Sequence, residues 1–331
     1  MMNRSSHFKN GKFENLHATP VFDKESGQRI ALFNNFFRKH PGRRPADIIP
    51  SVKTDLLNLP RDQNVLVWFG HSSYLMQVDG KRILVDPVFS GNASPVPGMI
   101  KAFRGADIYS VEDLPEIDYL LITHDHYDHL DYETICELRP KTGLVICGLG
   151  VGSHLEHWGY DKVKIIEKDW YEDLEPDSGF IIHTHPARHF SGRSFARNNT
   201  LWLSFVLQTP TMKIFIGGDS GYDTHFAEAG EKYGPFDLAI IENGQYNDAW
   251  RYIHAKPEEV LKAAGDLNAR RLLPVHSGKL ALGMHPWKEP LVRITELSKS
   301  SDIRLLTPMI GEQVNLKDDR QVFKRWWEGI N

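Results

Sequence analysis

The sequence predicts an α/β domain in which two β-sheets pack together and are flanked by helices. Short apolar runs typical of buried strands recur from residue 65 to residue 306, and segments with helical periodicity lie between several of them. No linker interrupts this series. The 331 residues are 41% hydrophobic and 25% charged, which is the composition of a globular protein. Strands mixed with single helices over this length favour two packed sheets covered by helices.

The chain begins with a segment of a different kind. Residues 1–60 show weak periodicity and several helix and strand breakers, among them Pro20, Pro41 and Pro60. We therefore expect an irregular N-terminal arm over residues 1–60 that wraps the main domain, residues 61–331.

The expected strands follow from the apolar runs. They cover residues 65–69, 74–78, 83–85, 119–122, 144–147, 163–166, 180–183, 201–207, 213–216, 238–241, 272–275 and 304–306. Asp79-Gly80 between the second and third runs is a type I′ hairpin signal. Asp131 can cap a helix to Leu138, and further helices are expected at 152–158, 223–232, 257–267 and 289–298. The long loop at 87–117 is typical of a functional segment.

Charge and targeting features exclude several classes of protein. The net charge of −4 is unlike that of a strongly basic nucleic-acid binder, so no nucleic-acid partner is expected. No apolar stretch approaches the ~18 residues of a membrane span, and the polar N-terminus lacks the apolar centre of a signal peptide. Two cysteines, Cys136 and Cys147, are too few for a disulfide framework. We expect a cytoplasmic protein, whose oligomeric state the sequence leaves open.

The most specific signal is a histidine-rich motif among the 16 histidines of the chain. Thr123-His124-Asp125-His126-Tyr127-Asp128-His129 places three imidazoles and two carboxylates within six positions. Such a cluster is costly without a partner, and a divalent ion such as zinc, iron or manganese is a suitable one. On a turn after a strand, His124 and His126 can face one ion while Asp128 and His129 face a second.

One motif cannot complete two metal sites, so further ligands are expected at the ends of apolar strands. Three segments qualify. The first ends in a run that contains His183, His185 and His189. The second ends in Asp219 after two glycines, and the third ends in His276.

This pattern resembles the binuclear metallo-β-lactamase fold, because His124-x-His126-x-Asp128-His129 is followed in order by His189, Asp219 and His276. Over residues 60–315 the chain is also similar to the N-acyl-phosphatidylethanolamine-hydrolysing phospholipase D branch. The motifs that carry this similarity are Trp68-Phe69-Gly70-His71-Ser72-Ser73, Asp86-Pro87-Val88-Phe89-Ser90, Ala93-Ser94-Pro95, Asn199-Thr200-Leu201-Trp202, Gly218-Asp219-Ser220-Gly221-Tyr222, Tyr233-Gly234-Pro235-Phe236-Asp237-Leu238 and His254-Ala255-Lys256-Pro257-Glu258-Glu259. The resemblance implies a four-layer αββα sandwich.

The resemblance also implies a role for each matching residue. One ion would be held by His124, His126 and His189, the other by Asp128, His129 and His276, and Asp219 would bridge the two. His71 and Asp86 would orient ligand histidines. His183 and His185 would be structural, and His254 would lie near the substrate. Lys279 departs from the family pattern after His276, and a lysine beside the metals is a candidate for phosphate binding.

The expected chemistry is hydrolysis. Two divalent ions, most simply zinc with manganese or iron as alternatives, can hold a hydroxide between them because they lower the pKa of water towards about 7. Asp128, Asp219, His254 and Lys279 are the candidate catalytic residues. A phosphodiester also needs cationic help, for which Lys279 and the cluster of Arg188, Arg193 and Arg197 are candidates.

Several functions remain open from the sequence. The leading one is hydrolysis of a phosphodiester in a small-molecule or lipid-derived substrate, with a phospholipase D-like reaction as one form of it. A lactonase of the sugar-phosphate type would use the same ligands. A nuclease is disfavoured by the charge. A di-iron oxidoreductase would usually replace His126 by a carboxylate, and a non-catalytic binding module would be expected to have lost ligands.

Overall fold

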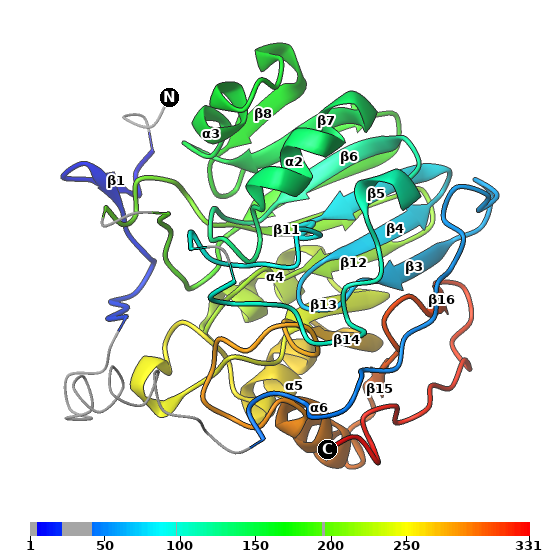
Figure 1. The fold of residues 1–331 in the computed structure, drawn as a ribbon. Helices are drawn as coiled ribbons and strands as arrows, with labels where there is room; N and C mark the ends of the chain where they lie inside the picture. Colours follow the sequence, from blue (N-terminus) through cyan, green and yellow to red (C-terminus); the bar gives the residue numbers. More distant parts are fainter. Residues whose placement is uncertain (1–4, 22–41, 97, 194–195) are drawn as a thin grey trace.

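The computed structural model describes residues 5–21, 42–96, 98–193 and 196–331 (Figure 1). These residues form two seven-stranded sheets and a two-stranded hairpin at the N-terminus. The hairpin consists of β1 (Phe8–Lys9) and β2 (Lys12–Phe13).

The first sheet has the spatial order β16-β3-β4-β5-β6-β7-β8. Its strands are β3 (Val65–Trp68), β4 (Tyr74–Val78), β5 (Lys81–Val85), β6 (Ile117–Ile122), β7 (Thr142–Gly148), β8 (Ile165–Lys168) and β16 (Gln313–Asn315). Neighbouring strands from β16 to β5 are antiparallel, and those from β5 to β8 are parallel.

The second sheet repeats this arrangement with the order β15-β14-β13-β12-β11-β10-β9. Its strands are β9 (Asp173–Asp177), β10 (Phe180–His185), β11 (Ser204–Gln208), β12 (Lys213–Ile216), β13 (Leu238–Glu242), β14 (Arg271–Val275) and β15 (Arg304–Leu305). Strands β9 to β12 pair antiparallel, and β12 to β15 pair parallel.

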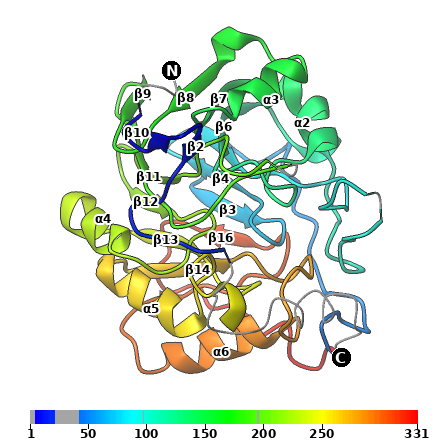
Figure 2. The same ribbon diagram turned by 90° about the vertical axis from the view of Figure 1, so that its left-hand side faces the viewer.

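Helices cover the outer face of each sheet (Figure 2). The first sheet carries α2 (Tyr132–Leu138) and α3 (Gly152–His157), and the second carries α4 (His225–Tyr233), α5 (Pro257–Asp266) and α6 (Glu289–Ser298). Short 3-10 turns lie at η2 (Val111–Asp113), η3 (Arg139–Lys141), η4 (Lys162–Lys164) and η5 (Asp248–Trp250). None of the described helices is long and apolar enough to cross a membrane.

The layers explain why the central strands are apolar throughout. Alternate residues of a strand point to opposite faces of its sheet. In β3, Leu66 and Trp68 join the core between the two sheets, whereas Val65 and Val67 join the core under the helices. Because both faces are covered, all four residues are buried. The predicted αββα four-layer sandwich is confirmed.

Several local expectations are met differently. Asp79 and Gly80 have φ values of 47° and 81°, as a type I′ hairpin requires. The segment 201–207, expected to be one strand, forms a strand only from Ser204. Leu201 and Leu203 are buried, but their N–H groups donate to the carbonyls of Leu149 and Thr123 in loops.

The N-terminal arm is less irregular than expected where the structure describes it. Phe13 at the end of its hairpin is 0% exposed and packs into the core between the sheets, as Ile49 does further along. Residues 22–41 of the expected arm lie outside the described residues.

Candidate metal centre

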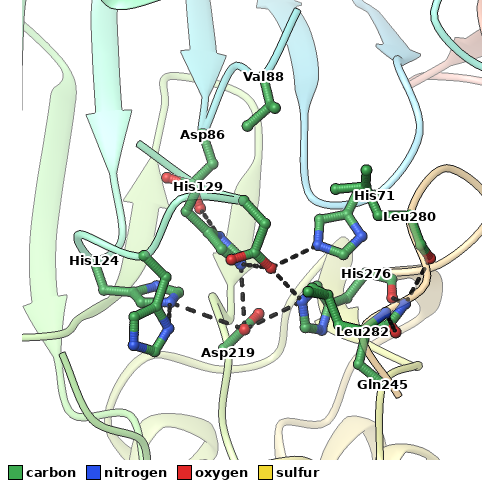
Figure 3. Close-up of polar contacts among 12 residues, drawn as sticks. His71, Asp86, Val88, His124, His129, Asp219, Gln245, His276, Leu280 and Leu282 are labelled. Atoms are coloured by element: carbon green, nitrogen blue, oxygen red, sulfur yellow. Dashed lines mark hydrogen bonds and ion pairs between the residues drawn. The ribbon is translucent and has the colours of Figure 1, made fainter. Parts of the chain in front are cut away.

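The predicted ligands come together at one edge of the sandwich, where strands of both sheets end (Figure 3). The 124–129 motif follows β6 of the first sheet, while Asp219 and His276 follow β12 and β14 of the second. His189 lies in the loop after β10. The carboxyl ends of parallel strands in one sheet meet at one edge, so facing sheets bring both sets of side chains to a common point.

Three histidines form one half of the cluster. Nε2 of His124 lies 2.9 Å from Nδ1 of His126, and Nε2 of His189 lies 3.2 Å from the same atom of His126. Nitrogen atoms this close are directed at one point, as the ligands of a single ion are. These three residues form one of the groups whose ligand atoms all lie within 4.8 Å of one another.

The other half of the cluster contains a carboxylate. Oδ2 of Asp128 lies 3.5 Å from Nε2 of His129 and 3.3 Å from Nε2 of His276. Nε2 of His71 also lies 2.9 Å from this oxygen. These four buried residues form a second group with closely spaced ligand atoms.

Asp219 lies between the two halves. Its Oδ2 atom is 3.9 Å from Nε2 of His124 and 3.8 Å from Nε2 of His189. The same oxygen is 3.2 Å from Nε2 of both His129 and His276. One carboxylate oxygen therefore faces both halves, which is the position that a bridging ligand needs.

The donor atoms fit a divalent metal. Imidazole nitrogen and carboxylate oxygen are the ligands that zinc and related ions take in proteins. Nε2 of His129 and Oδ1 of Asp219 are buried without a hydrogen-bond partner among the described residues. Unsatisfied buried polar atoms are rare and need an explanation, and a metal ion between them supplies one. The protein thus has a His/Asp cluster able to hold metal ions.

The pKa values of the histidines differ between the halves. Burial lowers the pKa of His124 and His189 well below the ordinary value, and also lowers that of His126, so these rings are neutral and ready to bind an ion. Burial also acts against the charged form of His276, but the carboxylates of Asp219, Asp128 and Glu242 outweigh it and raise the pKa to about 9. Burial likewise lowers the pKa of His129, but the carboxylates of Asp219 and Asp128 outweigh this effect and raise it above the ordinary value. A metal ion that binds in this half has to displace the protons on His129 and His276.

Second nitrogens of the ligand rings are held by fixed partners. Nδ1 of His129 lies 2.8 Å from Oδ2 of Asp86, which also accepts a hydrogen bond from the Thr123 hydroxyl. Nδ1 of His189 lies 2.9 Å from the carbonyl oxygen of Ile253. Such partners set the ring orientation and leave Nε2 for the ion.

Three residues of this site have a left-handed backbone conformation. His71, Asp86 and His276 have φ values of 54°, 41° and 64°. A left-handed conformation is uncommon for residues other than glycine and costs about 1–3 kcal/mol in sparsely populated regions. Three such residues within one site indicate that the surrounding structure fixes the orientation of these side chains at a cost in stability.

Glu242 is a site residue that the sequence did not indicate. It ends β13 and is 0% exposed. Its Oε2 atom lies 3.0 Å from Nδ1 of His276 and 2.7 Å from Nδ1 of His254. The available signal was a single carboxylate at the end of an apolar strand, and the sequence does not show that this strand pairs with two strands that end in predicted ligands.

A cavity of about 300 Å³ lies over the cluster. It exposes both halves, since His126, His189, Asp128, Asp219 and His276 all line it. The remaining lining residues are Val21, Ala93, Tyr127, Phe190, Arg197, Trp250, Ile253, His254 and Leu282. His254 therefore lies beside the His/Asp cluster, and most of the other walls are apolar.

Lys279 is not in this cavity, and the expectation that it binds a substrate phosphate is corrected. Its side chain is 1% exposed, and its Nζ donates to the carbonyl oxygen of Val88 at 2.8 Å. It also pairs with Asp107 at 2.7 Å. Lys279 thus fastens the long 87–117 loop, because the chain turns at Gly278 (φ 76°) and directs the next side chain away from His276.

The three arginines of the expected cluster have different surroundings. Arg188 donates to the carbonyl oxygen of Ala18, and Arg193 donates to that of Asp125 and lies over the ring of Tyr127. Arg197 is exposed, lies over the ring of Phe190 at 5.2 Å and lines the cavity. Of the three, Arg197 is the one at the cavity above the cluster.

His183 and His185 lie outside the cluster. Nδ1 of His183 lies 2.5 Å from Oδ1 of Asp173, and the ring of His185 lies against Tyr171 and contacts the carbonyl oxygen of His225 at 2.9 Å. Both belong to β10 and its surroundings.

Comparison with known proteins identifies the family. A family model described as a beta-lactamase superfamily domain matches residues 81–277. The chain belongs to this superfamily. The predicted resemblance is confirmed at this level, and the matched residues include all the predicted metal ligands.

Curated relatives of this superfamily member include proteins with named activities. The N-acyl-phosphatidylethanolamine-hydrolyzing phospholipase D 1 of Caenorhabditis elegans is 29% identical over 268 residues, which are 74% of each chain. The mitochondrial N-acyl-phosphatidylethanolamine-hydrolyzing phospholipase D of Saccharomyces cerevisiae is 34% identical over 70% of this chain and 51% of its own length. An uncharacterised protein of Mycobacterium tuberculosis is 34% identical over 98% of this chain and 88% of its own.

Solved structures share the fold. Igni18, a metallo hydrolase from Ignicoccus hospitalis, has a TM-score of 0.56 and 19% identity, with 76% of this chain and 97% of that chain covered. Isothiocyanate hydrolase from Delia radicum gut bacteria has a TM-score of 0.60 and 18% identity, with 76% and 98% covered. The protein is a metal-dependent hydrolase of the metallo-β-lactamase superfamily.

Proposed function

We propose that this hydrolase cleaves phosphodiesters in a phospholipase D-like reaction, at a centre of two zinc ions. His124, His126 and His189 would hold one ion, Asp128, His129 and His276 would hold the other, and Asp219 would bridge them. The observation that carries the choice of substrate is the position of Arg197 at the cavity over this cluster. Among the described residues, no carboxylate forms an ion pair with the Arg197 guanidinium, so this group is available to a substrate anion.

The cavity supports an ester with an organic part of moderate size. Its walls are mainly apolar, with Ala93, Phe190, Trp250 and Leu282 among them, so they suit the carbon skeleton of a diester. A guanidinium forms strong charge-assisted hydrogen bonds to phosphate oxygens. An apolar cavity with one cation beside a metal cluster matches the two parts of such a substrate.

The names of two relatives point the same way. The C. elegans and S. cerevisiae proteins are named as N-acyl-phosphatidylethanolamine-hydrolyzing phospholipases D. We extend the phosphodiester bond type to this chain, and lipid-derived diesters are the substrates to test first.

The proposed reaction converts a phosphodiester and water into a phosphomonoester and an alcohol. When bound, the ions would supply positive charge for the phosphoryl oxygens and acidify water. Oδ1 of Asp219, buried without a partner among the described residues, would accept a hydrogen bond from the attacking water. Nε2 of His254 would give a proton to the leaving oxygen, since its Nδ1 is already held by Glu242, and the proton released by the attacking water would restore it.

The proposal is tested with Arg197→Gln on bis(4-nitrophenyl) phosphate and on a neutral lactone. Losing a charge-assisted hydrogen bond of about 1.5–3 kcal/mol corresponds to a rate loss of roughly 10- to 100-fold for the diester. The lactone should be hydrolysed at an unchanged rate. Arg251→Gln is the matched control, because Arg251 is also exposed and over an aromatic ring at 5.2 Å but does not line the cavity.

Two outcomes would overturn the proposal. If the wild type hydrolyses the lactone far faster than diesters, the protein is a lactonase. If Arg197→Gln and Arg251→Gln leave the diester rate equally unchanged, Arg197 does not bind the substrate anion. A panel that adds an N-acyl phospholipid and a thioester then separates lipid-derived diesters from other esters.

A further inference from the structure

The N-terminal arm contacts the loop that carries His189 through its backbone and the amide side chain of Asn15. After the hairpin β1–β2, the arm runs past the loop that follows β10 (Figure 2, dark blue). Phe13 anchors it in the core, and the N–H of Phe13 donates to the carbonyl oxygen of Asn198 at 2.8 Å. At the other end of this stretch, Val21 lines the cavity over the cluster. The arm therefore spans from the core to the cavity.

The Asn15 side chain forms hydrogen bonds with both the N–H and the carbonyl group of His189. Its Nδ2 donates to the carbonyl oxygen of His189 at 2.7 Å, and its Oδ1 accepts from the N–H of His189 at 3.1 Å. The same Oδ1 accepts from Nε1 of the buried Trp202 at 3.0 Å. One side chain thus pairs both main-chain groups of a metal-cluster residue and ties them to the core.

Arg188, the residue before His189, also binds the N-terminal arm. Its guanidinium donates to the carbonyl oxygen of Ala18 at 3.1 Å and to the hydroxyl of Thr19 at 3.0 Å. Nδ1 of His17 lies 2.9 Å from Oδ2 of Asp223, and the same oxygen lies 3.4 Å from Nε of Arg188. The arm is held at several points along this loop.

His189 needs such support because of where it lies. The other predicted ligands sit on the turn between β6 and α2 or within three residues of the end of a strand. His189 is four residues past the end of β10, in a segment without helix or strand, so no backbone ladder fixes it. Its Nδ1 is held by the Ile253 carbonyl, but its backbone is held by Asn15.

We infer that Asn15 is a positioning residue for His189, and that the N-terminal arm completes the ion position formed by His124, His126 and His189. The inference rests on the proposed metal role of these histidines. The N-terminal arm would then help to orient a metal ligand, and would not only cover the surface of the main domain. Partners that orient a ligand typically change metal affinity by about 10- to 100-fold when they are removed.

The test measures metal affinity in two single-position backgrounds. His276→Ala retains the position of His124, His126 and His189, and His124→Ala retains the other. In the His276→Ala protein, adding Asn15→Ala should weaken Zn²⁺ binding about 10- to 100-fold in competition with a chelating dye. In the His124→Ala protein, the same change should alter affinity less than twofold. Co²⁺ absorption in the His276→Ala background should change in shape as His189 loses its fixed position.

Matched variants separate positioning from general bracing. Glu14→Ala changes the neighbouring exposed residue, whose carboxylate pairs with Lys9, and should leave both affinities unchanged. Asn15→Asp keeps the acceptor for His189 N–H and Trp202 and should recover part of the affinity. Unfolding in chelator reports the stability of each metal-free variant.

Equal weakening in both backgrounds, or affinity unchanged by Asn15→Ala, would overturn the inference. If Asn15→Ala prevents folding, Asn15→Asp supplies the same comparison, and an effect equal in the two backgrounds would again overturn it. These measurements use no substrate. Failure of phosphodiester hydrolysis would therefore leave their outcome unaffected.

Discussion

Oε2 of Glu242 lies 3.0 Å from Nδ1 of His276, and both side chains are buried. The same oxygen lies 2.7 Å from Nδ1 of His254. Oε1 accepts hydrogen bonds from the backbone N–H groups of Ser220 and Ala255. One buried carboxylate therefore orients a predicted metal ligand and a histidine of the cavity wall, and is itself held by the backbone.

Glu242→Gln should weaken the ion held with His276. The amide keeps the size of the side chain but loses the charge that favours an Nδ1–H donor on both rings. Such a change typically costs about 10- to 100-fold in metal affinity or activity. Elemental analysis after dialysis and the diester rate measure the two effects. Glu231→Gln, an exposed change on α4, is the control, and equal metal content in both variants would contradict the prediction.

The sequence indicated the residues of the His/Asp cluster more readily than the residues that orient them. Six positions with three imidazoles, as in 124–129, are specific enough to predict a site without a structure. Glu242 is a single acidic residue after an apolar strand, and nothing in its neighbours distinguishes it from a strand end at the surface. Its role arises from the side-by-side pairing of β13 and β14, which the sequence does not state.

Lys279 shows why nearness in sequence fails as a guide. It lies three residues after His276, yet its side chain is directed to Val88 and Asp107. The positive φ of His276 and Gly278 reverses the chain there. Direction after a turn depends on backbone angles that composition does not reveal.

The central strands of both sheets were predicted, but two of the four edge strands were not. Strands covered on both faces, such as β13, are continuous apolar runs, and each was expected. β9 reads Asp-Leu-Glu-Pro-Asp and β16 has two exposed residues of three, because charges, proline and short length protect an edge strand from pairing with another chain. Both were missed.

Lys279→Met should act on stability and leave substrate preference unchanged. Removing a buried cation leaves Asp107 and the Val88 carbonyl without their partner, which costs roughly 2–4 kcal/mol. Urea unfolding should show this loss, while the ratio of diester to lactone rates stays within twofold of the wild type. Lys12→Met, an exposed change on β2, should alter neither quantity. A selective loss of diester hydrolysis would contradict this prediction and indicate that Lys279 acts on the substrate.

The purified protein should contain close to two divalent ions per chain. His189→Ala removes a ligand from one position and His276→Ala from the other, so each variant should keep about one tightly held ion. Asp219→Ala should lower the affinity of both ions, since its Oδ2 faces both halves. Elemental analysis at saturating zinc measures the stoichiometry. One ion in the wild type that survives His276→Ala would contradict the two-ion centre.

The metal-free protein should be most stable near neutral pH and lose stability in both directions. Below the unfolded-state value of about 6.5, unfolded histidines take up protons that His124 and His189 cannot accept in the fold, because burial holds their pKa well below that value. Acid therefore favours unfolding. His276 behaves in the opposite sense, because its folded-state pKa of about 9 lies above the unfolded value of 6.5.

The contribution of His276 is complete below pH 6.5 and disappears as the pH rises through about 9. A rise of this size corresponds to on the order of 3 kcal/mol. Urea unfolding in chelator across this range should show the alkaline decline, and His276→Gln should flatten it, while His17→Gln on the exposed arm should not. Saturating zinc should remove the decline, because the ion takes the place of the proton on His276. Metal-free stability that still increases between about pH 7 and 9 would contradict the charge pairing of His276 with Asp128 and Asp219.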